Sequence, residues 1–185
     1  TLEQVETHGR GGADTFVADD TVAAVKVYGD GGNDNFMIGR VLKTTTIIKD
    51  GKEIEVVDSS DPNVLGISNG VSFNGLFYGG SGDDYFEVNH NKGELSLFGE
   101  SGDDTFFLKA HLEFNVDPML SSAENQEQTE EKIGGMIEVG AGDEEGFVDG
   151  EDSDSLIDYV ENNRVNIFGG SGFDTIVVAG TAFDD

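Results

Sequence analysis

Residues 79–108 read GGSGDDYFEVNHNKGELSLFGESGDDTFFL, and this stretch contains the unit that decides the fold. A glycine-acid turn, GGSGDD, leads into a short alternating strand, a polar turn and a second alternating strand, after which the glycine turn returns as GESGDD. Apolar residues at every second position are typical of strands with one buried face. The unit of 20 residues therefore predicts two short strands joined by two turns.

The glycine-acid turn is written six times along the chain. The copies are GRGGAD at 9–14, GDGGND at 29–34, GGSGDD at 79–84, GESGDD at 99–104, VGAGDE at 139–144 and GGSGFD at 169–174. The last residues of successive copies are separated by 20, 50, 20, 40 and 30 positions. A strand–turn–strand unit that recurs in this way predicts a repeat architecture rather than six unrelated loops.

The alternation places apolar side chains on the same side of the chain in every unit. These inward positions hold Val25, Val27, Leu95, Leu97, Val165 and Ile167 before the turns, and Phe16, Phe36, Phe86, Phe106 and Ile176 after them. We predict an all-β fold, a right-handed parallel β-solenoid in which every coil adds one strand to each of two facing sheets. Residues 1–185 are expected to form a single segment of this solenoid.

Insertions explain the longer spacings. All of them lie after the first strand of a coil and before the second, so they are expected to leave from the edge opposite the glycine turns. Residues 39–75 contain the hairpin signal Asp50-Gly51. Residues 109–135 read as an acidic, helical insertion and 149–164 as a short helical loop. The sequence leaves open whether 39–75 contain a further rung without a motif, which would separate the second turn from the third.

The composition points to cations as ligands. The chain has 38 Asp and Glu against 10 Lys and Arg, a formal charge of −28. It lacks the positive stripe that nucleic-acid binding needs, and it has no apolar run of the length of a membrane span. There is no cysteine, so disulfides and thiolate metal sites are excluded. Because self-repulsion on this scale opposes compaction, the fold is expected to depend on bound metal.

The glycine turns have the chemistry of calcium sites. Calcium prefers six to eight oxygen ligands, including carboxylates and backbone carbonyls, and glycine lets a turn point its carbonyls inward. Stacked strands lie about 4.8 Å apart, so one ion fits between two successive turns, and six stacked turns would leave five such gaps. The predicted ligands are the final acids Asp14, Asp34, Asp84, Asp104, Glu144 and Asp174, with turn residues Gly9, Gly11, Gly29, Gly31, Gly79, Ser81, Gly99, Ser101, Ala141, Gly169 and Ser171.

GGSGDDYFE and GESGDDTFF resemble the nonapeptide GGxGxDxUx of the RTX, or haemolysin-type calcium-binding, repeats. The resemblance implies a parallel β-roll that binds calcium between consecutive turns, in a secreted bacterial protein that folds outside the cell. The family usually carries two glycine turns per coil, whereas this chain has one, so the resemblance implies one row of calcium sites. In the fifth copy Val139 replaces the first glycine and Glu144 the aspartate, which implies a weaker site.

We therefore expect a calcium-binding structural protein, extracellular or at the cell surface, such as a filament, surface-layer or adhesin segment, and not an enzyme. Neither end of the chain shows a polar cap, so neighbouring coils or copies of the chain stacked end to end are expected partners, together with surface glycans. The alternative is a carbohydrate-active enzyme or accessory module on a calcium-binding solenoid. An ice-binding solenoid is disfavoured because the threonine row that it would need is interrupted.

Outward aromatic residues recur once per coil and either stabilise the stack or mark a covered surface: Tyr28, Tyr78, Phe98 and Phe168.

Overall fold

The structure is a computed structural model of the chain, and it describes residues 4–49, 51–61, 63–115, 157–160 and 162–180. Within these residues the chain is all-β and contains no helix, so no helix that could cross a membrane occurs there. The chain divides into two compact units. The repeat unit comprises residues 1–41, 67–111 and 160–185, and the insertion unit comprises residues 42–66 and 112–159.

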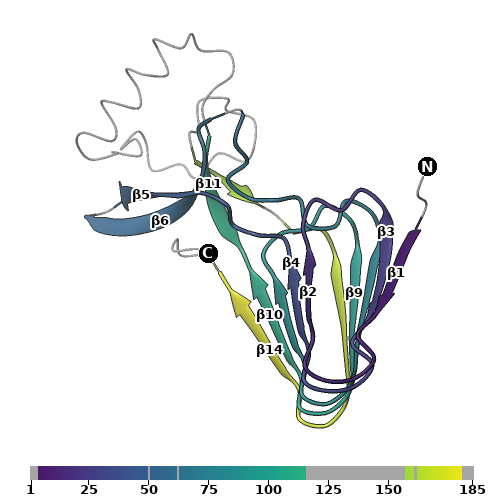
Figure 1. Cartoon of the computed structure of the whole chain (residues 1–185). Helices are drawn as coiled ribbons and strands as arrows, with labels where there is room; N and C mark the ends of the chain where they lie inside the picture. Colours follow the sequence, from purple (N-terminus) through teal and green to yellow (C-terminus); the bar gives the residue numbers. More distant parts are fainter. Residues whose placement is uncertain (1–3, 50, 62, 116–156, 161, 181–185) are drawn as a thin grey trace. The chain divides into compact units, whose positions relative to one another are not determined.

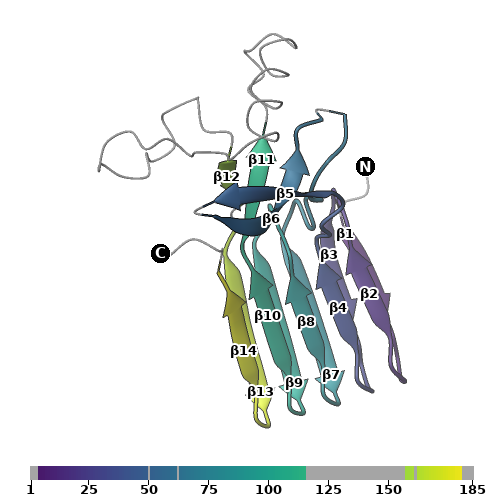
Figure 2. The ribbon, with the colours of Figure 1, turned by 90° about the vertical axis from the view of Figure 1, so that its left-hand side faces the viewer.

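The repeat unit consists of two five-stranded parallel sheets (Figures 1 and 2). The strands of the first sheet, in spatial order, are β1 (Gln4–His8), β3 (Ala24–Tyr28), β7 (Gly75–Ser81), β9 (Leu95–Ser101) and β13 (Val165–Ser171). The strands of the second sheet, in the matching order, are β2 (Thr15–Ala18), β4 (Asn35–Ile38), β8 (Tyr85–Val88), β10 (Thr105–Lys109) and β14 (Thr175–Ala179). Each described glycine turn joins a strand of the first sheet to one of the second, and we call this strand–turn–strand set a rung.

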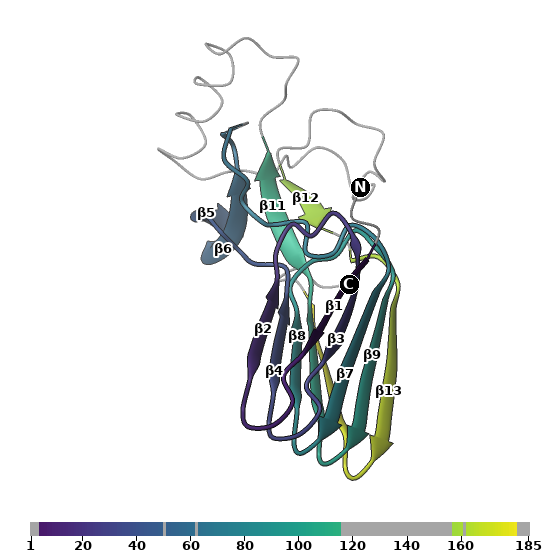
Figure 3. The ribbon, with the colours of Figure 1, turned by 45° about the vertical axis from the view of Figure 1, so that its right-hand side comes forward.

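Neighbouring rungs pair in the register of the motif, whatever their separation in sequence (Figure 3). Phe36 pairs with Phe86 across a separation of 50 residues, just as Phe86 pairs with Phe106 across 20. Because β3 pairs directly with β7 and β4 with β8, residues 39–75 place no rung between the second turn and the third. The question that the sequence left open is therefore answered.

The fourth motif copy lies beside the sixth. β9 pairs with β13 and β10 with β14, so the described residues contain five stacked turns and four gaps, where the sequence suggested six turns and five gaps. Copy six offers Ile176 and Val178 to the register positions of Phe106 and Leu108. Copy five has Gly146 where the large apolar residue is needed, so it is less suited to this place. Copy five itself lies outside the described residues.

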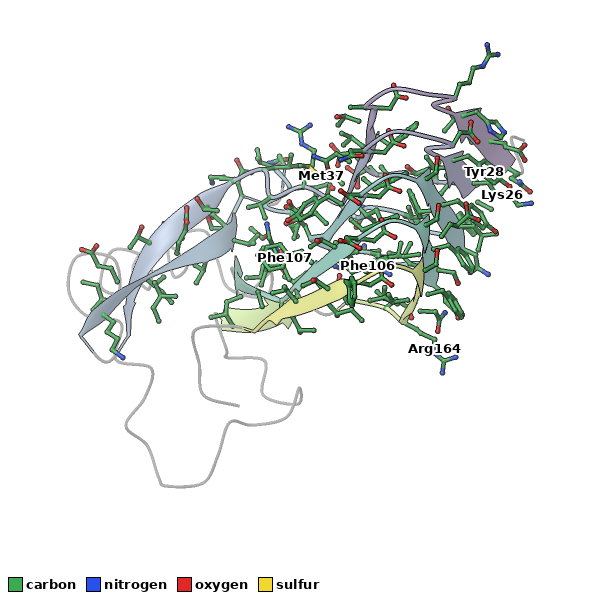
Figure 4. All side chains as sticks on the ribbon, turned by 90° about the horizontal axis from the view of Figure 1, so that it is seen from below. Lys26, Tyr28, Met37, Phe106, Phe107 and Arg164 are labelled. Atoms are coloured by element: carbon green, nitrogen blue, oxygen red, sulfur yellow. The ribbon has the colours of Figure 1, made fainter. Side chains whose placement is uncertain are left out.

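The hydrophobic core lies between the two sheets of the repeat unit. Phe36, Phe86 and Phe106 are fully buried and stack along the rungs, with ring centroids 4.5 Å and 4.8 Å apart. The sequence-predicted inward positions are thus confirmed for the inner rungs. Neighbouring residues lie on opposite faces, as Phe106 and Phe107 do on β10 (Figure 4). Stacked rings of this kind bury a large apolar area and hold the rungs in register.

The insertion unit contains a four-stranded sheet with the order β12-β11-β6-β5. Strands β5 (Thr44–Lys49) and β6 (Lys52–Ser59) are antiparallel and connected through Gly51, whose φ is +74°. The other two strands are β11 (His111–Asn115) and β12 (Ile157–Val160). Residues 157–160 were expected in a helical loop and are a strand, because Ile, Tyr and Val favour extended backbone. Residues 116–156, with most of the predicted acidic helix, lie outside the described residues.

Candidate metal-binding turns

The five described glycine turns share one backbone conformation. Their fourth residue is always glycine, with φ between 111° and 138°. A Cβ at Gly32 would overlap the carbonyl of Gly12 in the neighbouring turn, so close stacking also requires glycine there. The second residue also has positive φ but tolerates a side chain, as at Asp30 (69°) and Glu100 (75°). Glycine therefore occupies the fourth position of every described turn, whereas the second position also holds Arg10, Asp30 and Glu100.

The final aspartates form a continuous hydrogen-bonded row across all five described turns. The Oδ1 atom of each later aspartate accepts the backbone N–H of the aspartate one rung before it. The N···Oδ1 distances are 2.8 Å for Asp14–Asp34, Asp34–Asp84 and Asp84–Asp104, and 3.2 Å for Asp104–Asp174. The structure therefore brings together five of the six acids that the sequence predicted. Glu144, with Ala141, lies outside the described residues.

The second carboxylate oxygen of this row points into the turn. Oδ2 is buried and has no hydrogen-bond partner among the described residues in four of the turns, at Asp14, Asp34, Asp84 and Asp104. A Cβ at Gly9 would lie 2.6 Å from Asp14 Oδ2 and 2.8 Å from the carbonyl oxygen of Gly29 in the next turn. The carboxylate oxygen and a backbone carbonyl oxygen therefore border the same small space beside the first glycine.

The same arrangement recurs along the stack. A Cβ at Gly79 would overlap Asp84 Oδ2 and would lie 2.9 Å from the carbonyl oxygen of Gly99. Buried polar groups normally have partners, because a buried carboxylate oxygen without one loses its hydration and gains nothing in return. A repeated orphan oxygen of this kind is an unusual feature, and it marks the inside of the turns as the candidate site.

Burial and repulsion between carboxylates make ionisation of two members of the row, Asp84 and Asp104, unfavourable. The pKa of Asp84 is raised to about 6, mainly by burial; the Asp34 N–H acts to lower it, and the carboxylates of Asp104 and Asp34 act with burial to raise it. Burial likewise raises the pKa of Asp104, with the nearby Asp174 carboxylate acting in the same direction. At neutral pH the row therefore carries negative charge that the described part of the chain does not neutralise.

A second, solvent-exposed row was not predicted from the sequence. It is formed by the fifth turn position, where the side-chain oxygen of Asn33, Asp83 and Asp103 each accepts a backbone N–H from the following turn, at 3.1, 2.9 and 2.8 Å. The signal was present in the motif, which has Asn or Asp at this position in four of its six copies. The outer row fixes the register of the turns, and it adds negative charge outside them.

Two of the three serines predicted as ligands at the third turn position donate their hydroxyl to a backbone carbonyl of the neighbouring turn. The hydroxyl of Ser101 donates to the carbonyl oxygen of Gly80 at 3.1 Å, and that of Ser171 to the carbonyl oxygen of Glu100 at 3.4 Å. Both bonds link neighbouring turns. The serine side chains therefore help to hold the turns together, and the oxygens that remain for a ligand are the aspartate Oδ2 atoms and turn carbonyls.

These oxygens fit a hard cation such as calcium. Calcium accepts carboxylate and carbonyl oxygens in flexible geometry. In the described part of the chain no three His, Asp or Glu side chains come close enough to hold a metal by themselves. A cation in the turns would therefore rely on one carboxylate per turn together with backbone carbonyls. Softer metals, which prefer sulfur or imidazole ligands, are not suited to this set.

No protein-family model, curated protein or solved structure matches this chain. What the chain does must therefore be inferred from its own residues. The described residues that carry the most unusual chemistry are the aspartates of the inner row.

An aromatic ladder runs along the outer face of the first sheet. The rings of His8, Tyr28, Tyr78, Phe98 and Phe168 stack in this order, with centroids 4.5 to 4.8 Å apart and nearly parallel planes. Both faces of each inner ring are covered by its neighbours, so only ring edges are free. The ladder therefore stabilises the stack and offers little ring face for a sugar to lie against.

Proposed function

We propose that the chain is a calcium-stabilised structural segment, a two-sheet parallel β-solenoid, of an extracellular or cell-surface protein. The observation that carries this proposal is the row of buried Oδ2 atoms, which lack hydrogen-bond partners among the described residues in four successive turns. Such a row is costly in a chain without bound cations. It becomes favourable when positive charge lies among the oxygens.

The calcium ligands would be the Oδ2 atoms of the inner row and the carbonyl oxygens of the first glycine of the following turn. These residues are Asp14, Asp34, Asp84, Asp104 and Asp174, with Gly29, Gly79, Gly99 and Gly169. Bound calcium would supply the charge that offsets repulsion between stacked carboxylates. Because the ligands come together only in the folded chain, the binding free energy would add directly to folding stability.

Two further features support an extracellular structural role. Calcium modules outside cells bind with dissociation constants of about 10⁻⁴ to 10⁻³ M, a range that suits sites with few carboxylates. The resemblance of the turns to RTX repeats points to the same setting. The alternative of a carbohydrate-active module receives no support from the aromatic ladder, because its stacked rings cover each other's faces.

A calcium titration followed by far-UV circular dichroism and thermal unfolding tests the proposal, with magnesium as a control and EDTA to reverse the effect. Calcium is expected to raise the unfolding temperature and the β signal, and magnesium is not. The double variant Asp84→Asn/Asp104→Asn should lose most of this response. The matched control, Asp83→Asn/Asp103→Asn, removes the same charge from the outer row and should keep it. An equal response in the two variants would reject the inner row as the site.

A further inference from the structure

The repeat unit ends in an uncovered apolar edge on the side of β13 and β14. Ile176 and Val178 occupy inward positions of this last rung but are 58% and 72% exposed, whereas Phe106 in the rung before is fully buried. The outermost ring of the aromatic ladder, Phe168, is 52% exposed. Neither β13 nor β14 contains a charged residue or a proline, the usual devices that keep an edge strand from pairing.

The hydrogen bonds between rungs follow the same pattern in every gap, which makes the two ends of the stack complementary. The N–H groups of the fourth and sixth turn positions donate to the later turn, as Gly102 N does to Ser171 O at 2.9 Å, and the residue after the turn donates back to the earlier one, as Thr175 N does to Asp104 O at 2.8 Å. At the last rung the N–H groups of Gly172 and Asp174 have no acceptor among the described residues. At the first rung Gly11 O and Asp14 Oδ1 have no donor from the part of the chain that the structure describes. The first rung therefore presents the acceptors that the N–H groups of the last rung lack, and the last rung presents the donors that the acceptors of the first rung lack.

We infer that the β13–β14 end of one copy of this chain binds the β1–β2 end of a second copy, continuing both sheets head to tail. In the register of the motif, Asp174 would lie next to Asp14, Val165 next to Val5, and Ile176 next to Phe16. The Phe168 ring would stack on His8 and extend the ladder. A second copy is the occupant that supplies hydrogen bonds, apolar contacts and ring stacking in the same register.

This contact is heterologous and leaves a new free end on each partner, so it builds a linear assembly rather than a closed dimer. The inference rests on the proposed function in one respect. The carboxylates of Asp174 and Asp14 would meet at the junction, and like charges at this distance require a cation between them. Assembly is therefore expected to be stronger in calcium than in EDTA.

Sedimentation velocity of the full chain in calcium, over a hundredfold range of concentration, tests the contact. The weight-average mass of the wild type is expected to rise with concentration. That of Ile176→Lys is expected to stay at the mass of the monomer. Leu65→Lys, a control at a similarly exposed position (53%) in the insertion unit, should assemble like the wild type. A wild-type chain that stays monomeric throughout overturns the inference.

Single-cysteine variants test the orientation, because the chain has no cysteine of its own. Thr15→Cys and Thr175→Cys lie at exposed, register-equivalent positions of the two end strands, within disulfide range in the proposed junction. Only the mixture of the two variants should form covalent dimers under mild oxidation. Crosslinks within either variant alone, or none in the mixture, contradict head-to-tail stacking.

Circular dichroism on the same samples separates the two proposals. A calcium-induced β transition in a chain that neither assembles nor crosslinks would overturn the stacking and leave calcium binding intact. Crosslinking of the mixture in a chain that is indifferent to calcium would overturn the calcium proposal and leave the stacking intact.

Discussion

Replacing Asp84 by asparagine is expected to stabilise the metal-free chain and to weaken its response to calcium. Asparagine keeps the Oδ1 atom that accepts the Asp34 N–H at 2.8 Å. It replaces the buried, charged Oδ2 atom by an NH₂ group. Because Oδ2 borders the same space as the carbonyl oxygen of Gly99, this carbonyl is the expected acceptor for the new amide, which would replace an orphan oxygen by a donor.

The size of the effect follows from the pKa of Asp84, which burial, aided by the Asp104 and Asp34 carboxylates, raises from the ordinary 3.8 to about 6. At about 1.4 kcal/mol per tenfold change, this difference corresponds to about 3 kcal/mol. The folded chain binds this proton more tightly than the unfolded chain does. The contribution of Asp84 to the free energy of unfolding of the metal-free protein is therefore greatest below pH 4, and it falls as the pH rises to about 6. Asp84→Asn should remove this pH-dependent loss of stability. At pH 7 the metal-free variant should be about 3 kcal/mol more stable than the wild type.

Urea unfolding in EDTA at pH 4 and pH 7, followed by circular dichroism, measures this difference. Asp83→Asn is the matched control, because it removes the same charge from the exposed row and keeps the oxygen that accepts the Asp103 N–H. It should change stability by a few tenths of a kcal/mol at most. In calcium, Asp84→Asn should gain less stability than the wild type. A variant that is less stable than the wild type in EDTA at pH 7, or a control that gains as much, would refute the reasoning.

Two further substitutions test the packing of the rungs. Gly79→Ala should destabilise the chain strongly and abolish its calcium response in a thermal unfolding titration, because the added Cβ would overlap Asp84 Oδ2. The control Gly11→Ala should be tolerated, because its Cβ would meet only Gly31 O, at 3.6 Å. Phe86→Ala should lower the free energy of unfolding by about 3 to 5 kcal/mol in urea, because the ring is fully buried between two others. Val17→Ala, on the exposed face, should cost less than about 1 kcal/mol, and similar losses for both would contradict the stacked core.

The strands and the inner core were predictable because local chemistry determines them. Period-two alternation decides which side chains face inward, so Phe36, Leu97 and Phe106 could be placed in the core without knowing the pairing partners. Glycine at the fourth turn position and aspartate at the sixth likewise follow from the repeat alone. These features can be predicted from the sequence of a single repeat unit.

The partners of each rung were harder to predict, since they depend on contacts between distant segments. A separation of 70 residues between Asp104 and Asp174 gives no indication that their turns are neighbours, because another copy of the motif lies between them in the sequence. The orphan Oδ2 atoms also could not be foreseen. They arise because Oδ1 is used by the backbone of the next rung, which becomes evident only when the rungs are in register.

The glycine turns keep the same register whether 20, 50 or 70 residues separate neighbouring rungs. The length variation is therefore absorbed at the opposite edge of the repeat unit, where the chain can leave and return while the bonds between the turns are kept. The existing insertions are therefore natural grafting positions. A foreign peptide placed at the tip of one of them, for example beside the exposed Gly51, would be presented by a scaffold whose geometry is set elsewhere. Lineages that gain or exchange such loops could acquire new recognition surfaces while the ladder of turns stays unchanged.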